Sequence, residues 1–196
     1  MRGVRWDETR PLSRPEVRPT FAIAEYGAGN VRSVALALQR LGCEQTADLG
    51  AADLAVLPGV GSARTALAGL RASGHDRLLQ ERVEAGRPVL GICLGLQLAL
   101  DWTAEDGGVD GLGLVEGRSS RIAAGRVPRI GWAEVDGSGA FYFAHSYAAE
   151  SPHATAWSEG IVAEVRCGSF VGCQFHPEKS GDLGARYLES VCLSLV

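Results

Sequence analysis

One stretch of the chain constrains the fold more than any other. The apolar segment Val89–Ile92 runs through Gly91-Ile92-Cys93-Leu94-Gly95 straight into an apolar helical pattern. A strand that turns tightly into a helix at a nucleophilic residue needs glycine two positions before and after that residue, because side chains there would block the turn. The pattern predicts a nucleophile elbow, with the Cys93 thiol over a helix N-terminus that favours thiolate and the Leu94 N–H free to bind an oxyanion. The alternative is a cysteine that only fills the core.

Strand and helix patterns alternate through the first half of the chain, which implies a parallel sheet with helices on both faces. Apolar segments typical of strands lie at residues 21–25, 43–46, 54–57 and 89–92, and helical periodicity follows at 31–41, 63–70, 76–84 and 94–101. After residue 112 short strands with glycine turns predominate, at 126–135, 140–146, 161–165 and 170–175, before a last helix at 182–195. We therefore predict a single α/β domain, with a mostly parallel central sheet and antiparallel strands in the second half.

The first twenty residues have a different composition. Residues 1–20 carry Pro11, Pro15 and Pro19 among scattered charges, without an apolar period. Such a composition is typical of a flexible extension. We expect residues 1–20 to be an N-terminal extension and residues 21–196 to form the domain, whose length suits one hydrophobic core.

Charge and cysteine content narrow the class of function. The net charge is −4, so nucleic acid is not an expected partner, and no apolar stretch has the length of a membrane span. Five cysteines without a C-x-x-C spacing predict neither a disulfide framework nor a zinc site. We expect a cytoplasmic protein without metal or cofactor, since Gly27-Ala28-Gly29 is too short for a dinucleotide fingerprint.

A thiolate nucleophile needs a base, and Phe175-His176-Pro177-Glu178 supplies one. Pro177 favours an extended backbone at His176, so that Glu178 can return to the same side and fix the imidazole tautomer. The sequence thus predicts a Cys93, His176, Glu178 triad. A strand-end histidine and a solvated acid are the structural alternatives, and His145, after an apolar run, is a candidate for the wall of the site.

These motifs resemble the class I, or triad, glutamine amidotransferases, whose G-x-C-x-G-x-Q and H-P-E motifs match residues 91–97 and 176–178. Further matching segments occur in the expected order between residues 21 and 188, and they are similar to glutaminase subunits that supply a separate cyclase. These segments are residues 26–34, 57–61, 131–132, 141–147 and 174–180.

The resemblance implies that Cys93 attacks the carboxamide of L-glutamine and that water hydrolyses the resulting thioester. It also implies roles for six further residues: the Gly59-Val60 turn and Leu94 hold the oxyanion, while Gln97, Ser146 and Tyr147 hold the glutamine. Ammonia is then expected to pass to a partner, a cyclase subunit with a (β/α)₈ barrel that acts in histidine biosynthesis.

The resemblance also places three residues at the partner surface. Lys179 is the only lysine of the chain and Asn30 the only asparagine, and both are expected to face the cyclase together with Trp132. An exposed ion pair, a helix N-cap and a core aromatic are the respective alternatives. Arg129, Ala148 and Leu96 depart from the usual family pattern, and Ala148 lacks an aromatic ring expected near the gate between the subunits.

Three other functions stay open at the level of the sequence. The same glutaminase could serve a different synthase, or the chain could be a stand-alone cysteine hydrolase of γ-glutamyl compounds, which needs no partner. The third is a catalytically silent scaffold, against which the complete triad argues.

Overall fold

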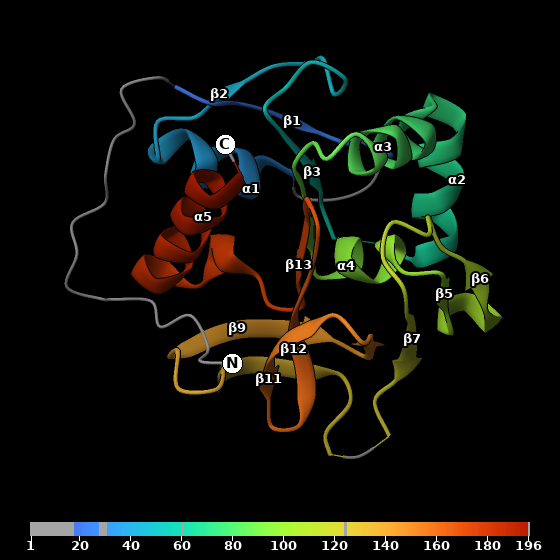
Figure 1. Ribbon diagram of the computed structural model, residues 1–196. Coiled ribbons are helices and arrows are strands. Elements are labelled where there is room, and N and C mark those ends of the chain that lie inside the picture. The colour runs from blue at the N-terminus through green and yellow to red at the C-terminus, as the bar shows by residue number, and fades with distance from the viewer. Residues whose placement is uncertain (1–17, 28–30, 60, 124, 196) are drawn as a thin grey trace.

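The computed structural model describes residues 18–27, 31–59, 61–123 and 125–195 (Figure 1). A seven-stranded sheet crosses the molecule in the order β11-β12-β13-β4-β3-β1-β2. From β13 to β2 neighbouring strands are parallel, whereas β12 and β11 continue the sheet antiparallel. The strands are β1 (Thr20–Ile23), β2 (Glu44–Gln45), β3 (Leu54–Leu57), β4 (Val89–Ile92), β11 (Ala154–Ser158), β12 (Ile161–Cys167) and β13 (Phe170–Cys173).

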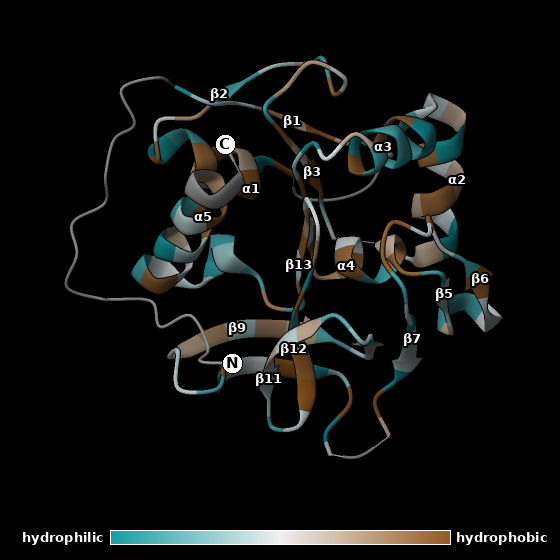
Figure 2. Cartoon of the chain, in the orientation of Figure 1, coloured by the Kyte–Doolittle hydropathy of each residue, from teal (hydrophilic) through white to brown (hydrophobic). Residues whose placement is uncertain are grey.

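Helices cover both faces of this sheet, as Figure 1 shows. One face packs against α1 (Val31–Arg40) and α5 (Gly181–Leu195), and the other against α2 (Ala63–Ser73), α3 (His75–Glu84) and α4 (Leu94–Ala99). Figure 2 shows hydrophobic and hydrophilic residues side by side on these helices, as expected for amphipathic helices on a sheet. None of the helices in the described part of the chain is long and apolar enough to cross a membrane.

Smaller strands complete one end of the molecule. The hairpin β8 (Arg129–Glu134) and β9 (Ala140–His145) is antiparallel, and a four-stranded sheet has the order β10-β7-β5-β6. Two short 3₁₀ helices, η1 (Glu105–Gly107) and η2 (Pro177–Lys179), flank the site described below. The remaining strands are β5 (Trp102–Thr103), β6 (Val109–Asp110), β7 (Arg118–Arg121) and β10 (Tyr147–Glu150).

The structure confirms the predicted α/β class, a mostly parallel sheet with antiparallel additions. β3 and β4 have the predicted bounds, but β5, β6, β7, β10 and β11 were not predicted. β1 begins at Thr20, one residue before the expected start of the domain, and Thr20 donates its N–H to Asp53 Oδ2 at 2.7 Å. Residues 1–17 of the predicted extension lie outside the described residues.

A buried arginine ties α3 to the loop before β3. Arg82 is 2% exposed, and its guanidinium donates to the carbonyls of four residues between 49 and 53 and of Pro88, at 2.9–3.3 Å. Burial, and to a smaller extent the neighbouring Arg87, lower the pKa of Arg82 to about 10, which still leaves it charged at neutral pH. Arg87 also donates to carbonyls of this loop, so two arginines that the apolar pattern could not reveal hold it in place.

Candidate active site

The elbow predicted from the glycine spacing is present between β4 and α4. Cys93 has φ 51° and ψ −107°, a conformation that costs a non-glycine residue roughly 1–3 kcal/mol. A Cβ at Gly95 would lie 2.0 Å from the Leu57 carbonyl oxygen, and one at Gly91 would lie 3.0 Å from the Leu96 nitrogen. Both glycines are required for the turn, and the surrounding packing holds the strained cysteine in place.

His176 and Glu178 lie next to the elbow because β13 is the parallel neighbour of β4. Cys173 pairs with Ile92, and the Cys93 N–H donates to the Cys173 carbonyl at 2.7 Å, so both strands end at the same edge of the sheet. His176 Nδ1 lies 2.9 Å from Glu178 Oε1, and both side chains are 5% exposed. The three residues of the predicted triad therefore come together.

The charge state of His176 follows from two opposing effects. Burial alone would lower the pKa of His176, but the hydrogen bonds of its ring with Cys93 and Glu178 outweigh burial and raise this pKa to about 9. At neutral pH the imidazole is therefore protonated and can donate a proton to a leaving group. Glu178 Oε2 has no hydrogen-bond partner among the described residues, so His176 is the main partner of this buried carboxylate.

Cys93 and His176 line a pocket of about 370 Å³. Within the described part of the chain, no group of three or more His, Cys, Asp or Glu side chains could hold a metal ion. Of the predicted substrate and partner residues, Gly59, Leu94, Gln97, Ser146, Tyr147 and Lys179 line the pocket, whereas Val60 and Asn30 lie outside the described residues. The other lining residues are Gly61, Glu105, Pro128, Ile130, Ala144 and His145.

The turn after β3 packs directly on the elbow. A Cβ at Gly59 would lie 1.9 Å from the Ile92 carbonyl oxygen and 2.4 Å from the Leu94 nitrogen, so only glycine fits there. The Tyr26 hydroxyl donates to the Pro58 carbonyl at 2.9 Å and holds the same turn. This close approach brings the turn beside the Leu94 N–H, the arrangement that an oxyanion hole requires.

Two buried glutamines connect the pocket wall to the nucleophile. Gln97 Nε2 donates to the Tyr147 carbonyl at 2.7 Å and to Gln174 Oε1 at 3.1 Å. Gln174 Nε2 in turn lies 3.6 Å from Cys93 Sγ. Sequence reasoning assigned no separate role to Gln174, although its spacing of two from His176 places both side chains on the same side of an extended chain.

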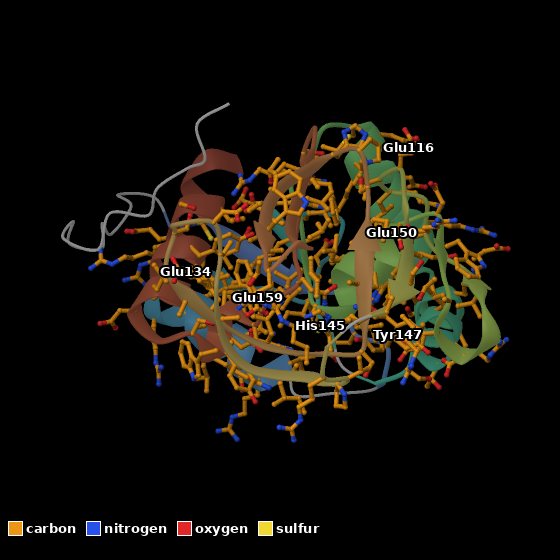
Figure 3. The ribbon with its side chains drawn as sticks, turned by 90° about the horizontal axis from the view of Figure 1, so that it is seen from below. Glu116, Glu134, His145, Tyr147, Glu150 and Glu159 are labelled. Atoms are coloured by element: carbon orange, nitrogen blue, oxygen red, sulfur yellow. The ribbon has the colours of Figure 1, made fainter. Side chains whose placement is uncertain are left out.

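His145 forms part of the pocket wall, as predicted. Its Nδ1 lies 2.8 Å from the Tyr147 carbonyl, and Figure 3 shows these two labelled residues near one another. Burial lowers the pKa of His145 to about 4; the Tyr147 carbonyl opposes this effect, and the nearby charges of Arg129 and His176 add to it. His145 is therefore neutral at pH 7.

Glu105 is a pocket residue that sequence reasoning missed, because it lies in a polar segment between short strands. It begins η1, and its Oε2 accepts the Ala63 N–H at 3.1 Å. Burial raises the pKa of Glu105, an effect that the Ala63 hydrogen bond opposes and that the nearby Asp106 charge reinforces. The residue brings a carboxylate to the pocket wall.

Exposed apolar side chains lie beside the pocket on the outer face of the β8–β9 hairpin. Ile130 is 64% exposed and Trp132 59% exposed, and Trp132 packs edge-on against Tyr142 with ring centroids 6.1 Å apart. Lys179 Nζ lies 5.9 Å from the Tyr142 ring centroid. We call Ile130, Trp132, Tyr142 and Lys179 the rim patch. Trp132 is a surface aromatic and not a core residue, the alternative weighed from the sequence.

The fold and the site together place an elbow cysteine beside a buried His–Glu pair at the edge of a mostly parallel sheet, the arrangement that a cysteine-dependent amide hydrolase requires. Residues 29–194 match the family described as glutamine amidotransferase class-I. The chain belongs to this family, and it is therefore a glutamine amidotransferase, as the motif resemblance predicted.

Curated relatives at about 40% identity are named as subunits of a synthase. The chain is 41% identical to imidazole glycerol phosphate synthase subunit HisH of Mycobacterium tuberculosis, with 87% of this chain and 96% of the relative covered. HisH of Oceanobacillus iheyensis is 37% identical, with 86% of this chain and 96% of the relative covered.

Two solved structures support the fold. One glutamine amidotransferase structure has a TM-score of 0.70 at 22% identity and covers 88% of this chain and 98% of its own. The structure of PurLQS from Thermotoga maritima has a TM-score of 0.71 at 19% identity, with 92% of this chain and 100% of that chain covered. At these identities the similarity concerns the fold alone.

Proposed function

We propose that this chain is the cytoplasmic glutaminase subunit of an imidazole glycerol phosphate synthase. It hydrolyses L-glutamine to glutamate and ammonia and passes the ammonia to a cyclase subunit of the HisF type, which forms imidazole glycerol phosphate and an aminoimidazole carboxamide ribotide. One observation carries this proposal: the buried Cys93 and His176, the latter paired with Glu178, line a pocket that has exposed apolar side chains at its edge.

In the first step the Cys93 thiolate attacks the side-chain carbonyl carbon of glutamine. The negative charge that develops on the carbonyl oxygen is held by the Leu94 N–H and by the turn that begins at Gly59. Protonated His176 donates its proton to the amide nitrogen, the C–N bond breaks, and ammonia leaves. A γ-glutamyl thioester on Cys93 and a neutral His176 remain.

In the second step water attacks the thioester carbonyl. Neutral His176 accepts a proton from this water, the C–S bond breaks, and the thiolate of Cys93 and the imidazolium of His176 are restored. Glutamate is the product. Glu178 keeps the imidazole oriented through both proton transfers, and its charge stabilises the imidazolium that alternates with the neutral ring.

The walls of the pocket suit the rest of a glutamine molecule. Both amide hydrogens of Gln97 are used by the Tyr147 carbonyl and Gln174, so only its carbonyl oxygen remains to accept a hydrogen bond from the substrate. Glu105 supplies a carboxylate for the α-ammonium group of the substrate. Ser146 and Tyr147 complete the wall, and their backbone N–H groups are the proposed donors to the α-carboxylate.

The rim patch is the proposed cyclase surface. Exposed aromatic and aliphatic side chains that cluster beside a site are typical of protein interfaces, and a cation among them adds specificity. Because the patch adjoins the pocket, a partner seated on it would cover the opening and receive the ammonia before it reaches solvent. Asn30, the remaining predicted contact, stays a prediction.

Glutamate release from L-glutamine tests the proposal, measured first with the chain alone and then with a HisF-type cyclase and its phosphoribulosyl substrate. We expect strong stimulation by the loaded partner. Cys93→Ala should abolish glutamine-dependent synthesis and leave synthesis from ammonium salts intact. Equal hydrolysis with and without the cyclase would instead identify a stand-alone hydrolase, and loss of both nitrogen sources in Cys93→Ala would contradict the division of labour.

A further inference from the structure

The geometry points to Gln174 as a positioning residue for the nucleophile: its side-chain amide donates an N–H to Cys93 Sγ at the end of a hydrogen-bond relay that starts at a backbone carbonyl. The inference deepens the proposed function, because it concerns the same thiolate. It rests on the contacts of Gln97, Gln174 and Tyr147 with one another and with the sulfur.

The direction of the relay follows from its first member. The Tyr147 carbonyl can only accept, so the Gln97 atom 2.7 Å away must be the nitrogen, and the His145 Nδ1 at 2.8 Å must carry its hydrogen. The second N–H of Gln97 then points to Gln174, whose side-chain carbonyl oxygen must accept it. The nitrogen of Gln174 is left facing Cys93, so the sulfur receives a donor and not an acceptor.

Burial keeps the relay in this direction. Gln174 is completely buried and Gln97 is 3% exposed, so water cannot replace a lost partner. The backbone of Gln174 is held as well, since its N–H donates to the Ala163 carbonyl at 2.9 Å. Rotating the Gln174 amide by half a turn would set N–H against N–H at Gln97 and oxygen against sulfur at Cys93. The first contact would be repulsive whatever the charge of Cys93, and the second would be repulsive for the thiolate.

The side-chain N–H of Gln174 offsets the effect of a nearby carbonyl oxygen that disfavours the Cys93 thiolate. The Ala144 carbonyl oxygen lies 3.9 Å from Cys93 Sγ and can accept from a thiol, but it repels a thiolate. The Gln174 N–H has the opposite preference, because a charged acceptor binds a donor more strongly than a neutral one. Gln174 therefore stabilises the thiolate before attack and again when the C–S bond breaks. The charged and titratable groups around Cys93 lie in its neighbouring strands and in the pocket wall. They are His176 beside it, Glu178 paired with that ring, the Cys173 thiol at the end of β13, and Lys179, Glu105, Tyr147 and neutral His145 in the pocket wall.

Alkylation of Cys93 by iodoacetamide tests the inference without using glutamine. The rate is measured against pH on the intact chain, with mass spectrometry of the Cys93 peptide as the readout. The test variant is Gln174→Met, which keeps the length of the side chain and removes the donor. Gln80→Met is the matched control, because Gln80 Nε2 also donates to a backbone carbonyl, that of Leu112 at 2.8 Å, away from the pocket.

We expect Gln174→Met to slow alkylation at pH 7 roughly tenfold and to move the midpoint of the pH profile upward by about one unit, with the same plateau at high pH. Gln80→Met should follow the parent. A second variant, Gln174→Glu, keeps an oxygen for Gln97 and sets an acidic group against the sulfur, so its midpoint should lie above that of the parent.

Profiles of Gln174→Met and the parent that superimpose would overturn the inference. A lower plateau at high pH with an unchanged midpoint would also overturn the inference. That result would mean that the substitution displaces the sulfur without changing its charge state. This test is independent of the proposed function. Iodoacetamide still measures the reactivity of the Cys93 thiolate in a chain that does not hydrolyse glutamine.

Discussion

At the scale of single residues, the two buried histidines of the site have opposite charge states although the same burial acts on both. His176 keeps its proton because its hydrogen bonds with Cys93 and Glu178 outweigh the effect of burial on its pKa. His145 loses its proton because burial outweighs its one hydrogen bond, to a neutral carbonyl, and nearby positive charges add to the effect of burial. The local environment therefore makes His176 a proton donor and leaves His145 a neutral residue of the pocket wall. Residue type alone does not distinguish these two roles, whereas the H-P-E motif around His176 does.

The low pKa of His145 predicts a loss of stability in acid. In the unfolded chain this histidine binds a proton near pH 6.5, but in the folded protein it does so only near pH 4, so the unfolded state holds more protons in between. Stability contributed by neutral His145 is present above pH 6.5 and falls as the pH drops toward 4. We expect a loss of about 2 kcal/mol at pH 5 from this residue.

Urea unfolding at pH 7.5 and pH 5 measures this effect in the parent and in His145→Gln. The variant should lose less free energy of unfolding over this interval than the parent. His153→Gln is the control, because that histidine lies in a partly exposed turn. An equal loss in parent and His145→Gln would show that other groups cause the acid sensitivity.

At the scale of elements, the site depends on how closely β3, β4 and β13 bring their carboxyl ends together. The loops that follow these strands carry Gly59, Cys93 and His176. Parallel neighbours end at the same edge, and the tight contact of the β3 turn with the elbow leaves room for no side chain at Gly59.

Gly59→Ala should therefore disturb the oxyanion turn more than it disturbs the fold. Its Cβ would meet the Ile92 carbonyl at 1.9 Å, so the turn must move away from the Leu94 N–H. We expect the rate of glutamine hydrolysis to fall about a hundredfold or more, the size of effect seen when an oxyanion donor is lost. The free energy of unfolding should fall by about 1–3 kcal/mol.

Gly86→Ala is the matched control for this substitution. Gly86 has φ +69°, and a methyl group added there would meet no atom within 4 Å, so the change should cost about 1 kcal/mol of stability and leave hydrolysis unchanged. Steady-state rates and thermal unfolding of both variants decide the comparison. Full activity in Gly59→Ala would contradict the role given to this turn.

At the scale of the whole molecule, the rim patch is a surface that the chain does not cover with its own described residues. Trp132 and Ile130 project from the outer face of β8, while the inner face of the hairpin packs on the core through Phe141 and Phe143. A hairpin with one buried face and one exposed apolar face is suited to join two subunits. A partner bound at the rim patch would then lie next to the pocket that contains Cys93 and His176.

Trp132→Ala should weaken the effect of the cyclase on glutamine hydrolysis. Removing a large exposed aromatic from the centre of a protein interface typically costs about 2 kcal/mol or more, about a thirtyfold loss of affinity. Titration of the chain with the cyclase measures this change. Trp157→Ala is the control, because Trp157 is 40% exposed on β11 outside the rim patch. Equal cyclase affinities of the two variants would place the partner elsewhere.

The sequence alone determined the parts of this protein that depend on local patterns. Glycine spacing around Cys93 predicted the elbow, the H-P-E motif predicted the His176–Glu178 pair, and apolar periodicity predicted the helices and the central strands. Each of these signals lies within a few residues, where steric limits and hydrophobic alternation act directly. The two-residue strands β5 and β6 have no such pattern, since they are too short to show a period.

The tertiary structure decided which distant residues meet. Gln174 reaches Cys93 across 81 positions of the chain, Glu105 reaches Ala63 across 42, and Arg82 reaches the loop before β3 across about 30. No local pattern marks these polar contacts, because a buried donor or acceptor is satisfied by whichever group the strand order and packing bring to it. The direction of the amide relay, and the donor that it presents to the nucleophile, exist only once the chain is folded.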